Sequence, residues 1–181
     1  MPEFTPFPKI ARLNRDIVVT EKIDGTNAAI GITEDGAVYA QSRSRVITPE
    51  DDNFGFARWV HDNSQRLVEA LGPGLHFGEW WGPGVQRGYG LAEKRFSLFN
   101  TGRWGDLEEQ LAEYDLHVVP VLYEGPFDQD EVAACLSALA LEGSAASPGF
   151  MRPEGVVVWH TAARVLFKVT IEKDEAPKNA N

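Results

Sequence analysis

The sequence predicts an α+β domain in which antiparallel β-strands are interspersed with helices. Short apolar, β-branched segments near the N-terminus are joined by Asp-Gly turns, a pattern typical of antiparallel pairing. Two stretches farther along the chain repeat apolar residues with the period of a helix. Strands and helices do not alternate regularly, so a parallel, doubly wound sheet is not indicated.

In the N-terminal half we expect three strands and one long helix. The strands cover about 17–22, 27–33 and 36–42, and the last two form a hairpin through Asp35-Gly36. The helix covers 54–71 and ends at Gly72-Pro73-Gly74. Its apolar face is formed by Phe56, Val60, Leu67 and Leu71.

The C-terminal half predicts a similar mixture. Further strands are expected at 75–80, 95–99, 155–160 and 164–170, and from His117 to Leu122. A Gly- and Pro-rich loop covers 82–90, and a Gly/Ser/Ala/Pro loop covers 143–149. Helices are expected at 106–114 and at 128–141, the second introduced by Asp128 as N-cap.

Length and composition are those of one globular domain. The 181 residues, 43% of them hydrophobic, fit a domain at 1–171 followed by a polar, flexible C-terminal tail at 172–181. No apolar run is long enough to span a membrane, and the N-terminus lacks the features of a signal peptide. Cys135 is the only cysteine, so no intrachain disulfide can form. These observations predict no membrane partner and a cytoplasmic location.

The net charge of -10 restricts the possible partners. Affinity for nucleic acid rests mainly on Lys and Arg neutralising phosphates, so this charge has the wrong sign for a strong general binder. A local basic groove on an acidic body stays possible. Acidic side chains also gather where divalent metals bind.

The most informative motif is Lys22-Ile23-Asp24-Gly25-Thr26-Asn27. It places an amine, a carboxylate, a tight turn and a carboxamide within six residues, directly after a β-branched strand. An amine held rigidly at a strand end is what covalent catalysis by lysine requires. On its own, the segment fits a solvated lysine beside an ordinary turn equally well.

Other side chains could form a site with Lys22. Glu79 lies among glycines and tryptophans, and Glu154 immediately precedes an apolar strand. Lys168 alternates with Phe167 and Val169, so its side chain faces the opposite side of its strand. By the same alternation, Arg43 and Arg45 share one face of their strand. Gln86 and Arg87 lie in the flexible loop at 82–90. The alternative interpretation of each is structural: a core strand, a turn or a solvated charge.

These groups suit attack by Lys22 on the α-phosphate of a nucleoside triphosphate. The amine must be neutral, against an ordinary pKa of about 10.4, and a cation such as Lys168 or a divalent metal favours that form. Glu154 could hold the metal directly or through water. Asp24 and Glu79 could accept hydrogen bonds from ribose hydroxyls, and Phe96 could stack on the base. P-loop, zinc-protease and nucleophile-elbow motifs are missing from the sequence.

The order of these motifs resembles that of the covalent nucleotidyltransferase superfamily, which comprises ATP-dependent RNA and DNA ligases and mRNA capping enzymes. The matching segments are Lys22–Asn27, Ser42-Arg43, Phe77-Gly78-Glu79, Phe96, Glu154–Val157 and the strand with Lys168. The resemblance implies an ATP-grasp-like nucleotidyltransferase fold. Asn27 stands where DNA ligases and capping enzymes usually carry arginine, and Gly-Thr-Asn is similar to RNA ligases of the nick-sealing type.

The resemblance implies an ATP-dependent RNA ligase. Lys22 would form lysyl-AMP, AMP would pass to an RNA 5′-phosphate, and a 3′-hydroxyl would displace AMP. ATP and Mg²⁺ or Mn²⁺ would be the cofactors. Lys22 and Lys168 would be the catalytic residues, and Glu154 and Glu79 would bind the metal. The implied nucleotide-binding residues are Glu21, Asp24, Gly25, Asn27, Arg43, Glu79, Phe96, Glu154 and Lys168. The implied contacts to RNA ends are Asn27, Arg45, Gln86 and Arg87.

Two alternatives stay open. One is a DNA ligase or a GTP-using capping-type enzyme. The other is a nucleotide-binding module that no longer seals ends, because Leu166 and Thr170 stand at the two positions where the family places a second lysine near Lys168. We also expect no C-terminal OB-type domain, so that a partner protein would supply the clamp on nucleic acid.

Overall fold

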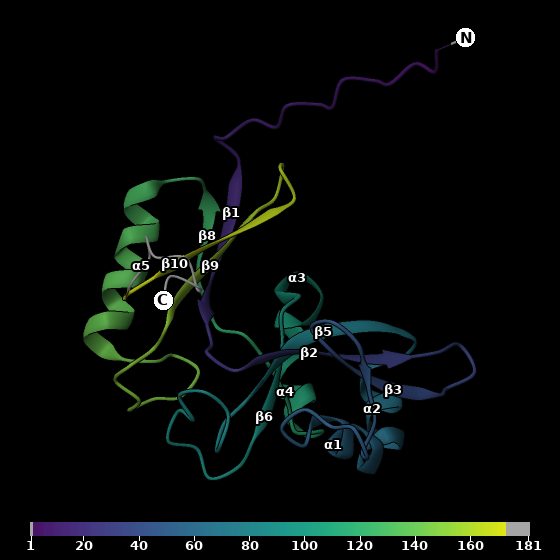
Figure 1. Ribbon diagram of the computed structural model, residues 1–181. Helices are drawn as coiled ribbons and strands as arrows, with labels where there is room; N and C mark the ends of the chain where they lie inside the picture. The colour runs from purple at the N-terminus through teal and green to yellow at the C-terminus, as the bar shows by residue number, and fades with distance from the viewer. Residues whose placement is uncertain (1, 173–181) are drawn as a thin grey trace, which may run out of the picture.

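Two β-sheets with helices on their outer faces form the body of the protein (Figure 1). The computed structural model describes residues 2–172, so the predicted tail, apart from Glu172, lies outside the described residues. The strands are β1 (Asp16–Lys22), β2 (Thr26–Ile32), β3 (Val38–Ser42), β4 (Val46–Ile47), β5 (Gly74–Trp81), β6 (Arg95–Leu98), β7 (Leu116–Val118), β8 (Val121–Pro126), β9 (Gly155–His160) and β10 (Val165–Thr170). The helices are α1 (Phe56–Asp62), α2 (Ser64–Leu71), α3 (Thr101–Trp104), η1 (Gly105–Leu107), α4 (Glu108–Ala112) and α5 (Gln129–Glu142).

The chain passes from one sheet to the other twice. The four-stranded sheet has the order β10-β9-β1-β8, and the six-stranded sheet has the order β4-β3-β2-β5-β6-β7. The chain therefore crosses from one sheet to the other between β1 and β2, and again between β7 and β8. All pairs are antiparallel except β6 with β7, which run parallel. The predicted α+β fold with antiparallel sheets and flanking helices is confirmed.

Each sheet has its own hydrophobic core. Alternate residues of β1 and β9, including Ile17, Val19 and Val158, pack with Leu139 of α5. A larger core joins the six-stranded sheet to α1, α2 and α4. A third, smaller cluster lies at the crossovers and contains Ile23, Trp81, Tyr89 and Val119. The two sheets are thus joined by a small apolar cluster beside the lysine motif.

Two predicted elements are each divided in the structure. The helix at 54–71 is two helices, because Asn63 leaves the helical conformation and its side-chain amide donates to the Trp59 carbonyl over 2.8 Å. The strand from His117 to Leu122 is divided at Val119-Pro120, and its parts lie in different sheets. Proline has no N–H to give to a strand ladder, which makes it a natural point of separation.

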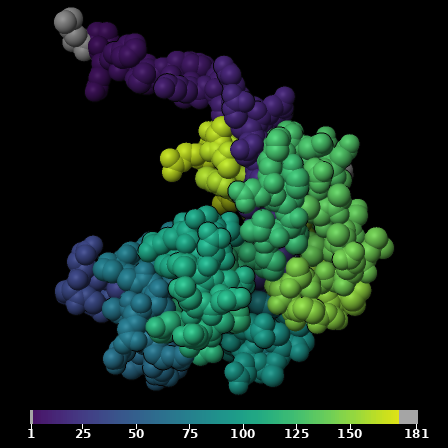
Figure 2. Space-filling model, turned by 180° about the vertical axis from the view of Figure 1, so that it is seen from behind, coloured from purple at the N-terminus to yellow at the C-terminus, as the bar shows by residue number. Residues whose placement is uncertain are grey.

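The first described residues run away from the body before β1 begins, as Figures 1 and 2 both show. The base of this segment is attached: the Arg15 carbonyl accepts from the Phe127 amide over 2.9 Å, and the Leu13 carbonyl lies 2.7 Å from the His160 ring.

None of the helices within residues 2–172 combines the length and apolar character needed to cross a bilayer.

The core beside α5 gives a direct test of the packing. Leu139 is 3% exposed and Leu141, on the same helix, is 78% exposed. We expect Leu139→Ala to lower the free energy of unfolding by about 2–5 kcal/mol, because it leaves a cavity against the four-stranded sheet. Leu141→Ala, the matched control, should change it by less than about 0.5 kcal/mol. Urea unfolding measures both, and equal effects would contradict this packing.

Candidate active site

Lys22 is the last residue of β1, and its side chain pairs with Glu154. The Lys22 Nζ lies 2.6 Å from Glu154 Oε2. This proximity follows from strand register, because β1 and β9 are adjacent, Lys22 is opposite Gly155, and Glu154 immediately precedes that glycine. The two side chains are 20% and 11% exposed, so the pair is sheltered but accessible.

The three residues after Lys22 carry the chain from one sheet to the other. The Asp24 amide donates to the Tyr89 hydroxyl over 2.9 Å, and the Gly25 amide donates to Glu79 Oε1 over 3.0 Å. A Cβ atom at Gly25 would lie 2.5 Å from the Trp80 carbonyl oxygen. Only glycine fits this close approach of crossover and strand.

Glu79 is a buried carboxylate that fixes the start of β2. Its second oxygen accepts from the Asn27 side-chain amide over 3.2 Å, and the residue is 7% exposed. Burial raises the pKa of Glu79 to about 7, although the Lys22 ammonium and the Gly25 amide oppose that shift. Protein donors engage both oxygens, and Glu79 belongs to no group of three or more potential metal ligands within residues 2–172. Its role as a metal ligand stays a prediction.

The register places Lys22 and Lys168 on one face of the four-stranded sheet. Lys168 pairs with Val157, which in turn pairs with Thr20, two residues before Lys22. Residues opposite one another share a face, and so do alternate residues of one strand. This is the face opposite α5. Lys168 is exposed and makes no salt bridge within the described part of the chain.

Two predicted nucleotide contacts point away from this site. The Phe96 side chain is fully buried in the core, where its ring stacks on Phe56 at 5.3 Å between centroids. Glu21 faces the side of β1 opposite to Lys22, and its carboxylate accepts from the Ser144 hydroxyl at 2.6 Å and the Ala146 amide at 2.8 Å. Burial raises the pKa of Glu21. The predicted stacking of Phe96 on the base is wrong for this structure, because Phe96 packs in the core. The Glu21 carboxylate fixes a loop, and nucleotide binding by Glu21 stays a prediction.

Sequence reasoning missed two aromatic residues on the face of Glu79. Phe77 lies two residues before Glu79 on β5, and Phe99 follows β6, where Ser97 is opposite Glu79. Their exposed fractions are 55% and 39%. The period of two could have identified Phe77, but Phe99 depends on the pairing of β5 with β6. Tyr89 was also missed, because nothing in the loop sequence shows that its hydroxyl reaches Asp24.

The predicted RNA-contacting residues of the loops differ in their surroundings. The Arg87 guanidinium donates to Asp24 Oδ2 over 2.9 Å and is directed into the protein. Arg45 forms a salt bridge with Asp51. The strand does not continue from Arg43 to Arg45, since β3 ends at Ser42 and residues 43–45 form a bend. The shared face predicted for the two arginines is therefore wrong. Arg43 and Gln86 are exposed.

A metal ion would find few protein ligands at this site. No group of three or more His, Cys, Asp or Glu side chains within residues 2–172 is arranged to hold one. Glu154 is the carboxylate that pairs with Lys22, and one of its oxygens contacts the lysine. The residues around Lys22 could hold a divalent cation only if most of its ligands came from phosphate and water, as is usual for Mg²⁺ with a nucleotide.

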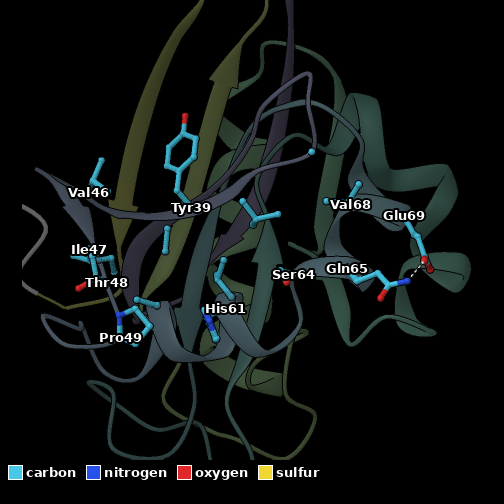
Figure 3. Close-up of a pocket in the computed structure, with 15 residues that line it drawn as sticks. Tyr39, Val46, Ile47, Thr48, Pro49, His61, Ser64, Gln65, Val68 and Glu69 are labelled. Atoms are coloured by element: carbon cyan, nitrogen blue, oxygen red, sulfur yellow. Dashed lines mark hydrogen bonds between the residues drawn. The ribbon is translucent and has the colours of Figure 1, made fainter.

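A separate cavity of about 670 Å³ lies between the β3–β4 edge and α1 and α2 (Figure 3). Val46, Ile47 and Val68 give it a largely apolar lining, with Gln65 and Glu69 at one end. No residue predicted to bind nucleotide or RNA lines it. Its volume therefore does not identify the chemical site.

The motif order and the site geometry agree with one known family. The model of the family described as RNA ligase matches residues 15–170. The chain belongs to the RNA ligase family. The match runs from just before β1 to the end of β10, and so includes both sheets and every residue of the site described above. Among curated proteins, no sequence matches the chain.

Solved structures support the fold of this RNA ligase family member. Naegleria gruberi RNA ligase, as a lysine variant with ATP and Mn, has a TM-score of 0.64 at 18% identity, covering 87% of this chain and 50% of that chain. The same ligase with PPi has a TM-score of 0.64 at 19% identity, covering 94% and 57%. A glutamate variant of the same ligase with AMP and Mn has a TM-score of 0.62 at 18% identity, covering 87% of this chain and 50% of that chain. The present chain spans about half the length of these proteins.

The raised pKa of Glu79 predicts a pH-dependent stability. Its ordinary value is 4.5 and its folded value is about 7. Between these values the folded protein keeps a proton that the unfolded chain releases, so stability falls as the pH rises and levels off above about 7. The contribution lost is roughly 3 kcal/mol.

Glu79→Gln lacks the titrating group and serves as the comparison. Subtracting its unfolding free energy from that of the parent, in urea titrations between about pH 4 and 8, removes the other titrations. The difference should decline with rising pH. A constant difference would contradict the assigned pKa.

Proposed function

We propose that this domain is the adenylyltransferase domain of an ATP-dependent RNA ligase, with Lys22 as the nucleophile. The observation that carries the proposal is the sheltered Lys22–Glu154 pair, 2.6 Å apart, at the end of β1 in a chain that belongs to this family. An amine held in one position beside a carboxylate has both the geometry for attack and a neighbour that can take its proton.

The proposed first step is transfer of AMP to Lys22. The ammonium gives a proton to Glu154 Oε2, and the free amine forms a bond to the α-phosphorus of ATP. The bond to the bridging oxygen breaks, and pyrophosphate leaves. The exposed Lys168 ammonium, on the same sheet face, stabilises negative charge on the phosphates.

Two further steps would complete sealing. An RNA 5′-phosphate oxygen attacks the phosphorus of lysyl-AMP, which breaks the N–P bond and gives an adenylylated RNA end. An RNA 3′-hydroxyl then attacks that 5′-phosphate and displaces AMP. The partners proposed here are therefore RNA ends, and the proposed setting is the cytoplasm.

A divalent cation, Mg²⁺ or Mn²⁺, would supply charge neutralisation and polarisation of the phosphates when bound. Glu154 is the residue that would hold it, directly or through water. Mn accompanies ATP in the Naegleria gruberi ligase structure, which supports this choice of metal.

The nucleoside would lie over the face of Glu79. Asp24 and Glu79 flank the crossover and offer carboxylate oxygens to ribose hydroxyls. Phe77 and Phe99, adjacent on that face, provide the aromatic surface that Phe96 does not. The Asn27 side-chain amide donates a hydrogen bond to Glu79 and so orients its carboxylate.

The decisive experiment is the intact mass of the protein after incubation with ATP and Mg²⁺ or Mn²⁺. We expect the mass to rise by one adenylate and peptide mapping to place it on Lys22. Lys22→Ala should abolish the adduct, because Lys22 is the lysine that pairs with Glu154 within residues 2–172. Lys9→Ala, an exposed lysine outside the site, should label normally. Normal labelling of Lys22→Ala would refute the proposed nucleophile.

The aromatic surface makes a second prediction. Phe77→Ala and Phe99→Ala should each raise the ATP concentration for half-maximal labelling by roughly fivefold or more, since stacking on a base contributes about 1–3 kcal/mol. Phe7→Ala removes an exposed phenylalanine 83% accessible in the N-terminal segment and should have no effect. Unchanged ATP dependence in both variants would place the base elsewhere.

Assays on the same purified protein distinguish the alternative functions. Labelling by ATP rather than GTP argues against a capping-type enzyme, and sealing of nicked RNA rather than DNA argues against a DNA ligase. A protein that forms the adduct but transfers no AMP to RNA, even with a nucleic-acid-binding partner protein, would be a nucleotide-binding module.

A further inference from the structure

Arg87 connects three segments of the proposed active site. It lies in the loop between β5 and β6, and its Nε donates to Asp24 Oδ2 over 2.9 Å. Its Nη1 donates to the carbonyl oxygens of Arg152 and Pro153 over 2.9 and 3.1 Å. The Arg87 side chain is 28% exposed, and that of Asp24 is 26% exposed, so the connection is largely sheltered from water.

The two ends of this connection are next to the two members of the lysine pair. Asp24 is two residues after Lys22, and Pro153 immediately precedes Glu154. A displacement of either segment would therefore change the separation of Lys22 Nζ and Glu154 Oε2. The remainder of the loop is also anchored, because the Tyr89 hydroxyl accepts from the Asp24 amide and the Tyr89 carbonyl accepts from the Ser147 hydroxyl.

We propose that Arg87 is a positioning residue that holds Lys22 and Glu154 in register for adenylate transfer, and that it does not contact RNA. This inference rests on the proposed function of Lys22. The guanidinium is suited to the task because its planar fork donates in fixed directions to a carboxylate and to backbone carbonyls. A lysine offers a single charged centre and cannot reproduce both connections.

The position of Arg87 distinguishes this role from RNA binding. Adenylate transfer to Lys22 needs no RNA, so loss of an RNA contact would leave that step unchanged. Loss of a positioning residue slows it, because a misplacement of about 1 Å can cost roughly 100-fold in rate.

The experiment is single-turnover labelling at a series of ATP concentrations, without RNA. We expect Arg87→Ala to lower the limiting rate by roughly 10- to 100-fold and to change the ATP concentration for half-maximal rate much less. Arg87→Lys should recover only a minor part of the rate. Full activity of Arg87→Ala in this assay, with loss of sealing alone, would overturn the inference and return Arg87 to the RNA surface.

Arg66→Ala is the matched control. Arg66 also pairs with a carboxylate, Asp115 at 3.1 Å, and donates to a backbone carbonyl, that of Glu113 at 2.7 Å. It lies on α2, which packs in the core of the six-stranded sheet, whereas Lys22 and Glu154 belong to the other sheet and its edge. Its replacement removes the same kinds of contact, so it should leave the labelling rate unchanged. Equal slowing in both variants would mean general destabilisation and would overturn the positioning role.

Hydrogen–deuterium exchange provides a readout that does not require labelling. In Arg87→Ala we expect faster exchange in peptides that contain residues 23–25 and the backbone around Glu154, with β3 unchanged. Unchanged exchange in those peptides would overturn the connection itself. If the parent protein forms no lysyl-AMP while the exchange changes as expected, the proposed function fails and the connection stands.

Discussion

The crossover at residues 23–25 is the constraint on which the site depends. β1 and β2 are consecutive in sequence but lie in different sheets, so the backbone between them has no strand partner. Buried amides must still be satisfied. The Tyr89 hydroxyl and the Glu79 carboxylate accept from Asp24 and Gly25 and replace the missing ladder. The groups that close the fold here are therefore also those that surround the proposed nucleophile, and fold and site cannot be altered independently.

Successive side chains of β1 point to opposite faces of the sheet, so one face has a structural role and the other presents the proposed nucleophile. Glu21 and Lys22 are neighbours in sequence, yet Glu21 is buried against the loop at 144–146 and Lys22 faces Glu154. The buried carboxylate is tolerated because a hydroxyl and an amide donate to it, which offsets part of the desolvation cost. One face of the strand thus fixes the loop that leads toward Glu154, and the other face presents the lysine.

Local sequence patterns predicted most of the strands, though not β4, and the turns beside Lys22, because these depend on short-range chemistry. The sequence did not show the strand register or the partners that long side chains contact. Phe96 and Phe99 both belong to the same short segment, and only the pairing of β6 with β5 decides that Phe96 enters the core and Phe99 does not. The loop arginine Arg87 was predicted to contact RNA, because nothing in the sequence indicates that Asp24 and Pro153 converge on it. Pro120 marks the division of strand 117–122, but the sequence does not show that the two parts lie in different sheets.

The charge around Lys22 explains why the proposed chemistry needs added cations. Asp24, Glu79 and Glu154 surround the lysine, and Arg87 is already paired with Asp24. A triphosphate brings further negative charge into this sheltered region, where charges interact more strongly than in water. Protonation of Glu79 near neutral pH removes one negative charge, and Lys168 contributes one positive charge. Neither balances a triphosphate, so the proposed nucleotide would need a divalent cation whose remaining ligands are phosphate oxygens and water.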